Sequence, residues 1–211
     1  GSLVDMWSVA YQIAHRAGAD PGYPGLYGPP ELAPPTRPDT LIVLETEGWS
    51  QCDETTRNAF EAILDQLGSL DVKLVTRNEL PAIEAFEQNI DDSMVLCRIL
   101  CSYEMRWALR HYQSTGLLSD DLSLWLEMAE AITLDDYRKA LERREQMRDS
   151  LATLKGLASA MITLSSPGPA PELGALTPSG ESGYAFKTGS PAFNAATSAL
   201  GSPALTLPLA A

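Results

Sequence analysis

Residues 188–208 read TGSPAFNAATSALGSPALTLP, a run without a charged side chain that glycine and proline divide into short pieces. Charged residues are rarely buried unpaired, whereas Gly and Pro mark turns, so such a run is typical of strands and turns in a folded core. We therefore expect this stretch to lie inside a domain that continues beyond Ala211.

The tail that contains this run, residues 162–211, holds only three charged residues, together with seven prolines and six glycines. Its Gly and Pro content alone would also suit a flexible linker. Two apolar runs, Met161–Leu164 and Ala204–Leu207, are each followed by a proline and favour strands instead. We expect buried core strands rather than a linker.

The composition of the whole chain limits its class. With 45% hydrophobic and 20% charged residues, the 211 residues suffice for one domain or part of one, and disorder throughout is not expected. The formal net charge is −13, from 28 acidic and 15 basic residues, which repels nucleic-acid backbones and anionic membrane surfaces. We therefore expect no nucleic acid and no membrane among the partners.

Three further features bear on the cellular location. No apolar run approaches the roughly 18–20 residues of a membrane-spanning helix, and the N-terminus lacks the pattern of an export signal. The three cysteines, Cys52, Cys97 and Cys101, form no even, loop-rich disulfide framework. These features predict a protein of the reducing cytoplasm.

The first third of the chain predicts a helix, a proline-rich loop and a β–α–β unit. Apolar residues at three- and four-residue spacing predict a helix over Leu3–Ala17. Seven prolines within residues 20–38 exclude a helix or an interior strand, so we expect an extended surface segment there. Short β-rich runs at Thr40–Leu44 and Asp71–Val75 flank a helix that Asp53 would cap. The two strands should therefore lie parallel in one sheet.

A largely helical block is expected from about residue 80 to residue 161. It begins at Leu80-Pro81, and apolar residues recur at helical spacing behind them. Thr133 is expected to cap the longest helix, and Asp135 and Asp136 suit its first turn. The apolar face of this helix is expected to run as far as Met161.

Serine and histidine side chains are the first candidates for chemistry. Ser165 and Ser166 stand before Pro-Gly in a turn that would suit a nucleophile, but no lysine stands in a motif that would make it the base. His15 and His111, the only histidines, occupy polar positions on predicted helices. A Ser-His-Asp triad would need one of them to meet a serine across the fold. We interpret the serines as turn residues.

Cysteines, paired acids and aromatic residues give weaker signals. Cys97 and Cys101 could share one side of a helix, but without paired ligand spacing we expect small buried apolar roles and no metal site. Acidic pairs that precede or open helices act as caps more often than as catalytic or metal-binding dyads. The pairs are Asp91-Asp92, Asp120-Asp121 and Asp135-Asp136. Trp107, Tyr112 and Trp125 are expected to pack in the core, although one of them could line a pocket mouth.

Several segments together resemble the amidase signature family, whose members hydrolyse carboxamides with a Ser-Ser-Lys machinery. The tail carries the pattern TG-x-x-x-x-N followed by LG-x-PA-x-x-x-P. The opening GSLVDMWSVAYQIAHRAGADPGYPG is similar to the family segment that follows the nucleophile region. Between them PDTLIVLETEG, ITLDDYRKALERREQMRDSL and MITLSSPGPAP fall in the family's order. The resemblance covers essentially the whole chain.

This resemblance implies the fold and the organisation of the chain. It implies an α/β class, as part of the amidase signature fold, in which helices cover a mixed β-sheet. Residues 1–211 would form a single partial amidase domain made of residues 1–79, the helical block 80–161 and the tail 162–211. The catalytic lysine and both catalytic serines would lie upstream of this chain, so the chain itself would hold no catalytic residue. No cofactor is implied.

The resemblance also implies where substrate would lie. In the family, the stretch equivalent to residues 188–191 and the helix start after it border the acyl-binding channel. Thr188, Pro191 and Ala195 are therefore expected as wall residues, with ordinary turn and helix-capping positions as the equal alternative.

Two functions from different classes follow. The chain could be the non-catalytic portion of an amidase for a small-molecule amide, with the missing N-terminal half as its partner. It could instead be an acidic helical interaction module that binds a partner through residues 80–161. A homodimer is left open.

Overall fold

A computed structural model describes residues 2–17, 34–170, 177–178, 185–186, 190–207 and 209. The chain divides into two compact units, Gly1–Arg37 and Pro38–Ala211. The first unit contains helix α1 (Leu3–Ala17), whose bounds agree with those predicted from the apolar spacing. Large apolar side chains of α1, among them Met6 and Trp7, are exposed. Most of the predicted extended proline-rich segment lies outside the described residues.

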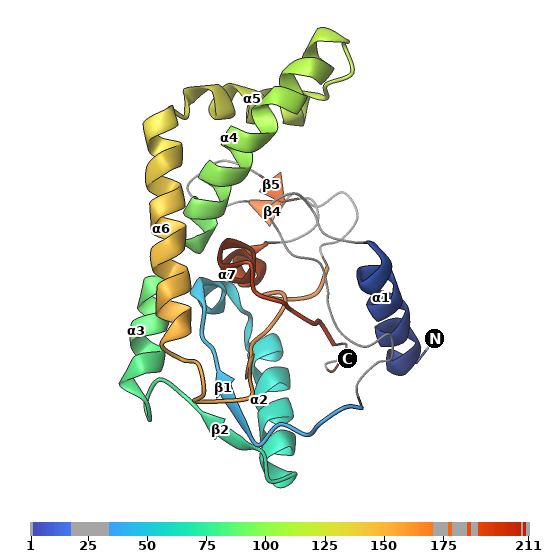
Figure 1. Cartoon of the computed structure of the whole chain (residues 1–211), viewed down its shortest axis with the longest axis vertical. Coiled ribbons are helices and arrows are strands. Elements are labelled where there is room, and N and C mark those ends of the chain that lie inside the picture. Colours follow the sequence, from blue (N-terminus) through green and yellow to red (C-terminus); the bar gives the residue numbers. More distant parts are fainter. Residues whose placement is uncertain are drawn as a thin grey trace. The chain divides into compact units, whose positions relative to one another are not determined.

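The second unit is built on a parallel sheet with the strand order β2-β1-β3 (Figure 1). The central strand β1 (Thr40–Val43) pairs parallel with β2 (Lys73–Val75) and with β3 (Ala160–Ile162). A short antiparallel pair, β4 (Thr177–Pro178) and β5 (Ala185–Phe186), forms a separate two-stranded sheet. The class is therefore α/β, although the described strands do not join into the single mixed sheet that was expected.

The β–α–β unit is confirmed at both strands and at the helix between them. Helix α2 (Glu54–Ser69) begins after Asp53, whose carboxylate accepts a hydrogen bond from Thr56 N at 2.7 Å. This bond satisfies one of the free N–H groups at the helix start. Phe60 packs the inner face of α2 into the core.

Four helices follow β2 and confirm the helical block. They are α3 (Pro81–Asn89), α4 (Ser93–Ser114), α5 (Asp120–Ala131) and α6 (Leu134–Ala152). The capping box at the start of α6 pairs Thr133 with Asp136, as the sequence indicated. Two details were wrong: α4, with 22 residues, is longer than α6, with 19, and α6 ends at Ala152. The chain turns at Gly156, which has a φ of 86°, and Met161 belongs to β3.

The tail contains a buried helix in the run that composition alone assigned to strands and turns, at the point where the family resemblance implied a helix start. Helix α7 (Ala192–Leu200) holds no charged residue, and it packs against α4, α6 and the short 3-10 helix η1 (Glu47–Gln51). Gly201 ends it with a left-handed φ of 66°. Of the two predicted core strands, Met161–Leu164 overlaps the strand β3, which is largely exposed rather than buried. Ala204–Leu207 is exposed and forms no strand. An apolar run becomes a buried strand only where a neighbouring strand pairs with it.

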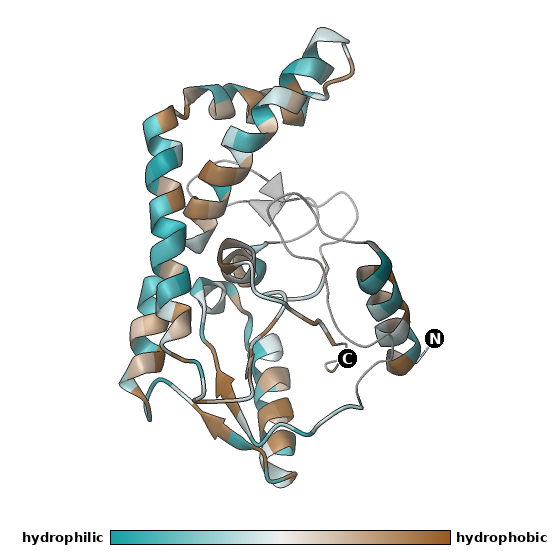
Figure 2. Ribbon diagram, in the orientation of Figure 1, coloured by the Kyte–Doolittle hydropathy of each residue, from teal (hydrophilic) through white to brown (hydrophobic). Residues whose placement is uncertain are grey.

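The hydrophobic core of the second unit lies between the sheet and the helices. Figure 2 shows α6 as largely hydrophilic, whereas β1 and α7 are mostly apolar. The largest fully buried side chains are Phe86, Phe193, Ile42, Ile83, Ile90 and Met147. They come from β1, from α3 with the residue that follows it, from α6 and from α7. The tail is therefore part of the core, as expected, although it enters the core as a helix.

Three predictions of burial were wrong on α4. Trp107 is 64% exposed and Tyr112 is 50% exposed, because the C-terminal half of α4 extends with α5 away from the sheet (Figure 1). Cys101 is exposed as well, whereas Cys97 is half-buried. Trp125 fits the prediction better, since it is partly buried and donates a hydrogen bond from Nε1 to Ser102 Oγ at 2.8 Å.

Candidate functional site

The carboxyl ends of the three parallel strands meet at one edge of the sheet. Residue Leu44 and helix η1 follow β1, Thr76 and Arg77 follow β2, and residues 163–168 follow β3. Open parallel sheets bind ligands outside the carboxyl ends of their strands. We therefore take this edge, together with α7 beside η1, as the candidate functional site.

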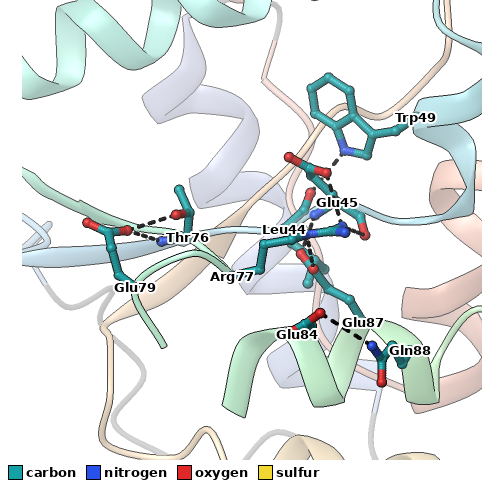
Figure 3. Close-up of polar contacts among 9 residues, drawn as sticks. All are labelled: Leu44, Glu45, Trp49, Thr76, Arg77, Glu79, Glu84, Glu87 and Gln88. Carbon is teal, nitrogen blue, oxygen red and sulfur yellow. Dashed lines mark hydrogen bonds and ion pairs between the residues drawn. The ribbon is translucent and has the colours of Figure 1, made fainter. Parts of the chain in front are cut away.

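An arginine and two glutamates fix the start of this edge (Figure 3). Arg77 Nε lies 2.7 Å from Glu87 Oε2, and Arg77 Nη2 lies 3.0 Å from Glu45 Oε2. The Glu87 side chain is only 4% exposed, and its Oε1 accepts a hydrogen bond from Glu45 N at 2.7 Å. Burial raises the pKa of Glu87, while the Glu45 N–H and the Arg77 charge act in the opposite direction. The cluster ties the ends of β1 and β2 to α3.

A second carboxyl at this edge belongs to Glu47 in η1. Its Oε1 accepts a hydrogen bond from Met94 N at 3.0 Å, in the first turn of α4. Burial raises the pKa of Glu47 to about 7, and the charges of Asp91 and Asp92 add to this rise against the effect of the Met94 N–H. A carboxyl that titrates near neutrality can take up and release a proton under ordinary conditions.

Cys97 connects α4 with α7 in the same region. Its thiol donates a hydrogen bond to Ala195 O, with Sγ 3.3 Å from the oxygen. Burial raises the pKa of Cys97 to about 11, so the thiol stays neutral at physiological pH. Because the thiolate is the nucleophilic form of cysteine, Cys97 holds α7 in place and is not activated for attack.

The start of α7 packs on η1 through an aromatic cluster. Phe193 is 1% exposed, and its ring lies 5.9 Å from the Trp49 ring in an edge-to-face arrangement. A Cβ added to Gly48 would come within 2.6 Å of the Phe193 ring, so only glycine allows this close approach. Trp49 is fixed by a hydrogen bond from Nε1 to Leu44 O at 3.1 Å and by edge contact with Phe60 at 5.3 Å.

The three predicted wall residues are placed as follows. Thr188 lies outside the described residues. Pro191 is the half-buried residue before the first turn of α7, and Ala195 is a buried residue of that helix whose carbonyl accepts the Cys97 thiol. Pro191 and Ala195 therefore lie on α7, the helix that packs on η1 and α4, and their role as wall residues stays a prediction.

The predicted turn at Ser165 and Ser166 is confirmed, and it is held by backbone groups. Ser166 Oγ donates to Gly168 O at 2.6 Å, and Asn194 in α7 donates from Nδ2 to Ser165 O at 3.2 Å. Among the described residues, no lysine or histidine forms a hydrogen bond with either serine. Both serines therefore serve as turn residues within the part of the chain that the structure describes.

Other candidates from the sequence serve as structural groups in their own elements. His15 stacks on Tyr11 in α1, with the ring centroids 6.0 Å apart. The acidic pairs stand at helix starts, as predicted: Asp120-Asp121 and Asp135-Asp136 lie in the first turns of α5 and α6, and Asp91-Asp92 precedes α4. Within the described ranges, no cluster of three or more His, Cys, Asp or Glu side chains could hold a metal ion.

Sequence reasoning missed the residues that define this edge, namely Glu47, Gly48, Trp49, Arg77 and Glu87. A signal was available for the first three, because Glu-Gly-Trp follows two residues after a short β-rich run. The ion pair between Arg77 and Glu87 joins residues ten apart across a loop and a helix. That contact depends on the fold and left no local pattern.

The fold itself is that of an amidase over most of this chain. The chain is similar to a solved crystal structure of an amidase, with 23% sequence identity and a TM-score of 0.55 over 77% of this chain. The matched part is 36% of the amidase chain, so this chain spans about a third of its length. No protein-family model matches the sequence, and no curated protein matches it. Among the described helices, none is long and apolar enough to cross a membrane.

Proposed function

We propose that this chain is the C-terminal-side portion of an amidase signature enzyme, which hydrolyses a small carboxamide. The observation that carries the proposal is the fold shared with the amidase crystal structure over 77% of this chain. The motif TG-x-x-x-x-N and the motif LG-x-PA-x-x-x-P support it, since they frame α7 at the candidate site.

In the proposed enzyme, the catalytic serines and the lysine come from a part of the protein outside this sequence. One serine attacks the amide carbon, and its proton passes through the second serine to the neutral lysine. Backbone N–H groups stabilise the negative charge that develops on the carbonyl oxygen. The present chain would supply the sheet, the helical cover and one wall of the acyl-binding channel.

Helix α7 is the proposed wall. It holds no charge, and the Cys97 thiol and the aromatic rings of η1 fix its position. A rigid, uncharged wall is suited to an uncharged acyl group, because it offers contact area without reorganisation. Thr188, Pro191 and Ala195 are the proposed wall residues.

The experiment is complementation by the missing half. The 211-residue chain is co-expressed with the N-terminal portion of an amidase that contains the Ser-Ser-Lys residues, and hydrolysis of a series of aliphatic and aromatic amides is followed. We expect turnover only when both parts are present. Absence of turnover with a half that binds this chain would contradict the proposal.

Variants at the wall sharpen this experiment. Thr188→Val and Pro191→Ala should change the ratio of kcat/KM between short and long acyl groups by about tenfold, the equivalent of roughly 1.4 kcal/mol. Ser198→Ala serves as the matched control, because Ser198 is an exposed residue of the same helix. If all three variants had the same ratio of kcat/KM as the unaltered chain, α7 would not line the channel.

A second candidate function, an acidic helical interaction module, has one observation in its favour. Trp107 is 64% exposed on α4, and the guanidinium groups of Arg106 and Arg110 lie 5.3 Å and 4.7 Å from its ring. Trp and Arg are the residues that dominate many protein interfaces. Under this alternative, the chain would bind its partner without any turnover in the complementation experiment, and Trp107→Ala would weaken that binding.

A further inference from the structure

The outer face of α4 carries a regular stripe of side chains. Its members stand alternately four and three residues apart: Met94, Arg98, Cys101, Met105, Ala108 and Tyr112. A mean spacing of 3.5 residues is the repeat with which two helices pack side by side along a seam. We call these six residues the α4 stripe.

The other faces of α4 already have neighbours. Ser102 accepts a hydrogen bond from Trp125 in α5, and Tyr103 stacks on Tyr137 in α6 at a centroid distance of 4.2 Å. Cys97 faces α7, where it bonds to Ala195. The α4 stripe, in contrast, is exposed over its C-terminal two-thirds, with Met105 at 42% and Tyr112 at 50%. Burial of such side chains against a partner would stabilise a complex.

The charges on this face are self-complementary. Arg98 is the only charged member of the stripe, it is half-buried, and no ion pair of Arg98 is seen within the described ranges. Glu104 lies beside the stripe, and its Oε1 accepts a hydrogen bond from Tyr137 OH at 2.8 Å. Arg98 and Glu104 stand three residues before and three residues after Cys101.

We propose that α4 of a second copy of this chain docks antiparallel on the α4 stripe, with a two-fold axis beside Cys101. In this register, Arg98 of each copy meets Glu104 of the other. Met94 of each copy likewise faces Ala108 of the other. A two-fold interface uses one patch twice, so a surface that is complementary to itself is what it requires.

The seam has a suitable length and charge balance. In this register the span from Met94 to Ala108 is shared by both copies and covers about 21 Å at roughly 1.5 Å per helical residue. The net charge of −13 opposes association of two copies. At physiological salt this repulsion is screened beyond about 8 Å, whereas the two reciprocal Arg98–Glu104 pairs act at contact distance.

The first test is sedimentation equilibrium of the full chain with charge-reversal variants. The wild-type chain should form a dimer. Arg98→Glu and Glu104→Arg should each raise the dissociation constant by about tenfold or more, and the double variant should restore the dimer, since both pairs are then re-formed with reversed sign. Glu127→Arg, on the exposed face of α5, is the control and should leave the dimer unchanged.

The second test uses the position of Cys101 at the proposed axis. Mild oxidation should give a covalent dimer of twice 22.8 kDa in a Cys52→Ser, Cys97→Ser background, and Cys101→Ser should abolish it. Far-UV circular dichroism checks that each variant is folded. A monomeric wild-type chain, a double variant no better than the singles, or a dimer lost when an amidase N-terminal half is bound would overturn the proposal.

Discussion

Helix α7 and the outer half of α4 are both rich in apolar residues, but their surroundings differ. In α7, six of nine residues are buried, and η1, α4 and α6 surround the helix. On α4, in contrast, Met105, Trp107 and Tyr112 are exposed beyond the core. An isolated helix of nine residues would not be stable in water, so α7 depends entirely on this packing. The comparison shows that the apolar content of a helix predicts its burial only where other elements of the fold pack against it.

The largest expected effect is on the free energy of unfolding, and it compares an aromatic residue of α7 with one of α4. Phe193→Ala should lower the free energy of unfolding by about 3–5 kcal/mol, because it opens a cavity against Gly48 and Trp49. Trp107→Ala should change it by less than about 1 kcal/mol, since Trp107 is mostly in water. Urea unfolding of both variants measures the difference. Equal effects would contradict the assignment of α7 to the core and of α4 to the surface.

The next effect tests the buried ion pair that holds the sheet edge on which α7 packs. Arg77→Met leaves the Glu87 carboxylate without its cation in a site where it is 4% exposed. We expect a loss of about 2 kcal/mol, below the roughly 3–5 kcal/mol of fully buried pairs because Arg77 itself is partly exposed. Arg138→Met, which removes only an exposed i,i+3 pair with Asp135, should cost less than about 0.5 kcal/mol. Thermal unfolding of both variants at pH 7 makes the comparison, and a larger loss from Arg138→Met would refute it.

Substitutions at two glycines distinguish the effect of close packing on stability from the effect of helix propensity. Gly48→Ala should cost about 1–3 kcal/mol, because the new methyl group would overlap the Phe193 ring. Gly68→Ala in α2 meets no atom within 4 Å and should stabilise the protein by about 0.5–1 kcal/mol. Chemical denaturation should therefore show a lower free energy of unfolding for Gly48→Ala and a higher one for Gly68→Ala. A neutral Gly48→Ala would mean that α7 does not press on η1.

The smallest expected effect is a pH dependence of the free energy of unfolding, caused by Glu47 where η1 meets α4. The pKa of Glu47 is raised to about 7 in the folded chain, so folding favours the protonated carboxyl. Its contribution to stability is therefore complete below about pH 4.5 and is lost as the pH rises through about 7. Because Glu47 is only partly buried, we expect the loss to be about 1 kcal/mol rather than the full value of the shift.

Glu47→Gln should remove this slope, which is read as the difference in unfolding free energy between wild type and variant from pH 5 to pH 8. Glu61→Gln, at an exposed position of α2, is the matched control. If the unfolding free energy of the wild-type chain rose relative to that of Glu47→Gln from pH 5 to pH 8, the prediction of a raised pKa for Glu47 would be contradicted.

Much of the fold was predictable because its signals are local. The bounds of α1, the Asp53 cap of α2 and the capping box of α6 each depend on residues within one or two helical turns. The parallel pairing of β1 with β2 followed from the crossover helix between them. Composition alone assigned the run of α7 to strands and turns, because an uncharged run of Ala, Thr and Ser has no clear period of its own, and only the family resemblance implied a helix start there.

The candidate site was much harder to predict. Phe193, Gly48 and Cys97 come from three segments far apart in the sequence, and only the packed fold brings them together. The exposure of Trp107 follows from where the core ends along α4, which the helical spacing of α4 does not encode. Pattern reasoning therefore identifies elements, while sites made between elements need coordinates.

The central claim is that this chain shapes a channel but contains no group that attacks an amide. Hydrolysis of acetamide and benzamide by the purified 211-residue chain, with Ser165→Ala and Ser166→Ala variants beside it, tests this claim most directly. Our account predicts no turnover above buffer for any of the three. Turnover by the unaltered chain that disappears in either serine variant would contradict it.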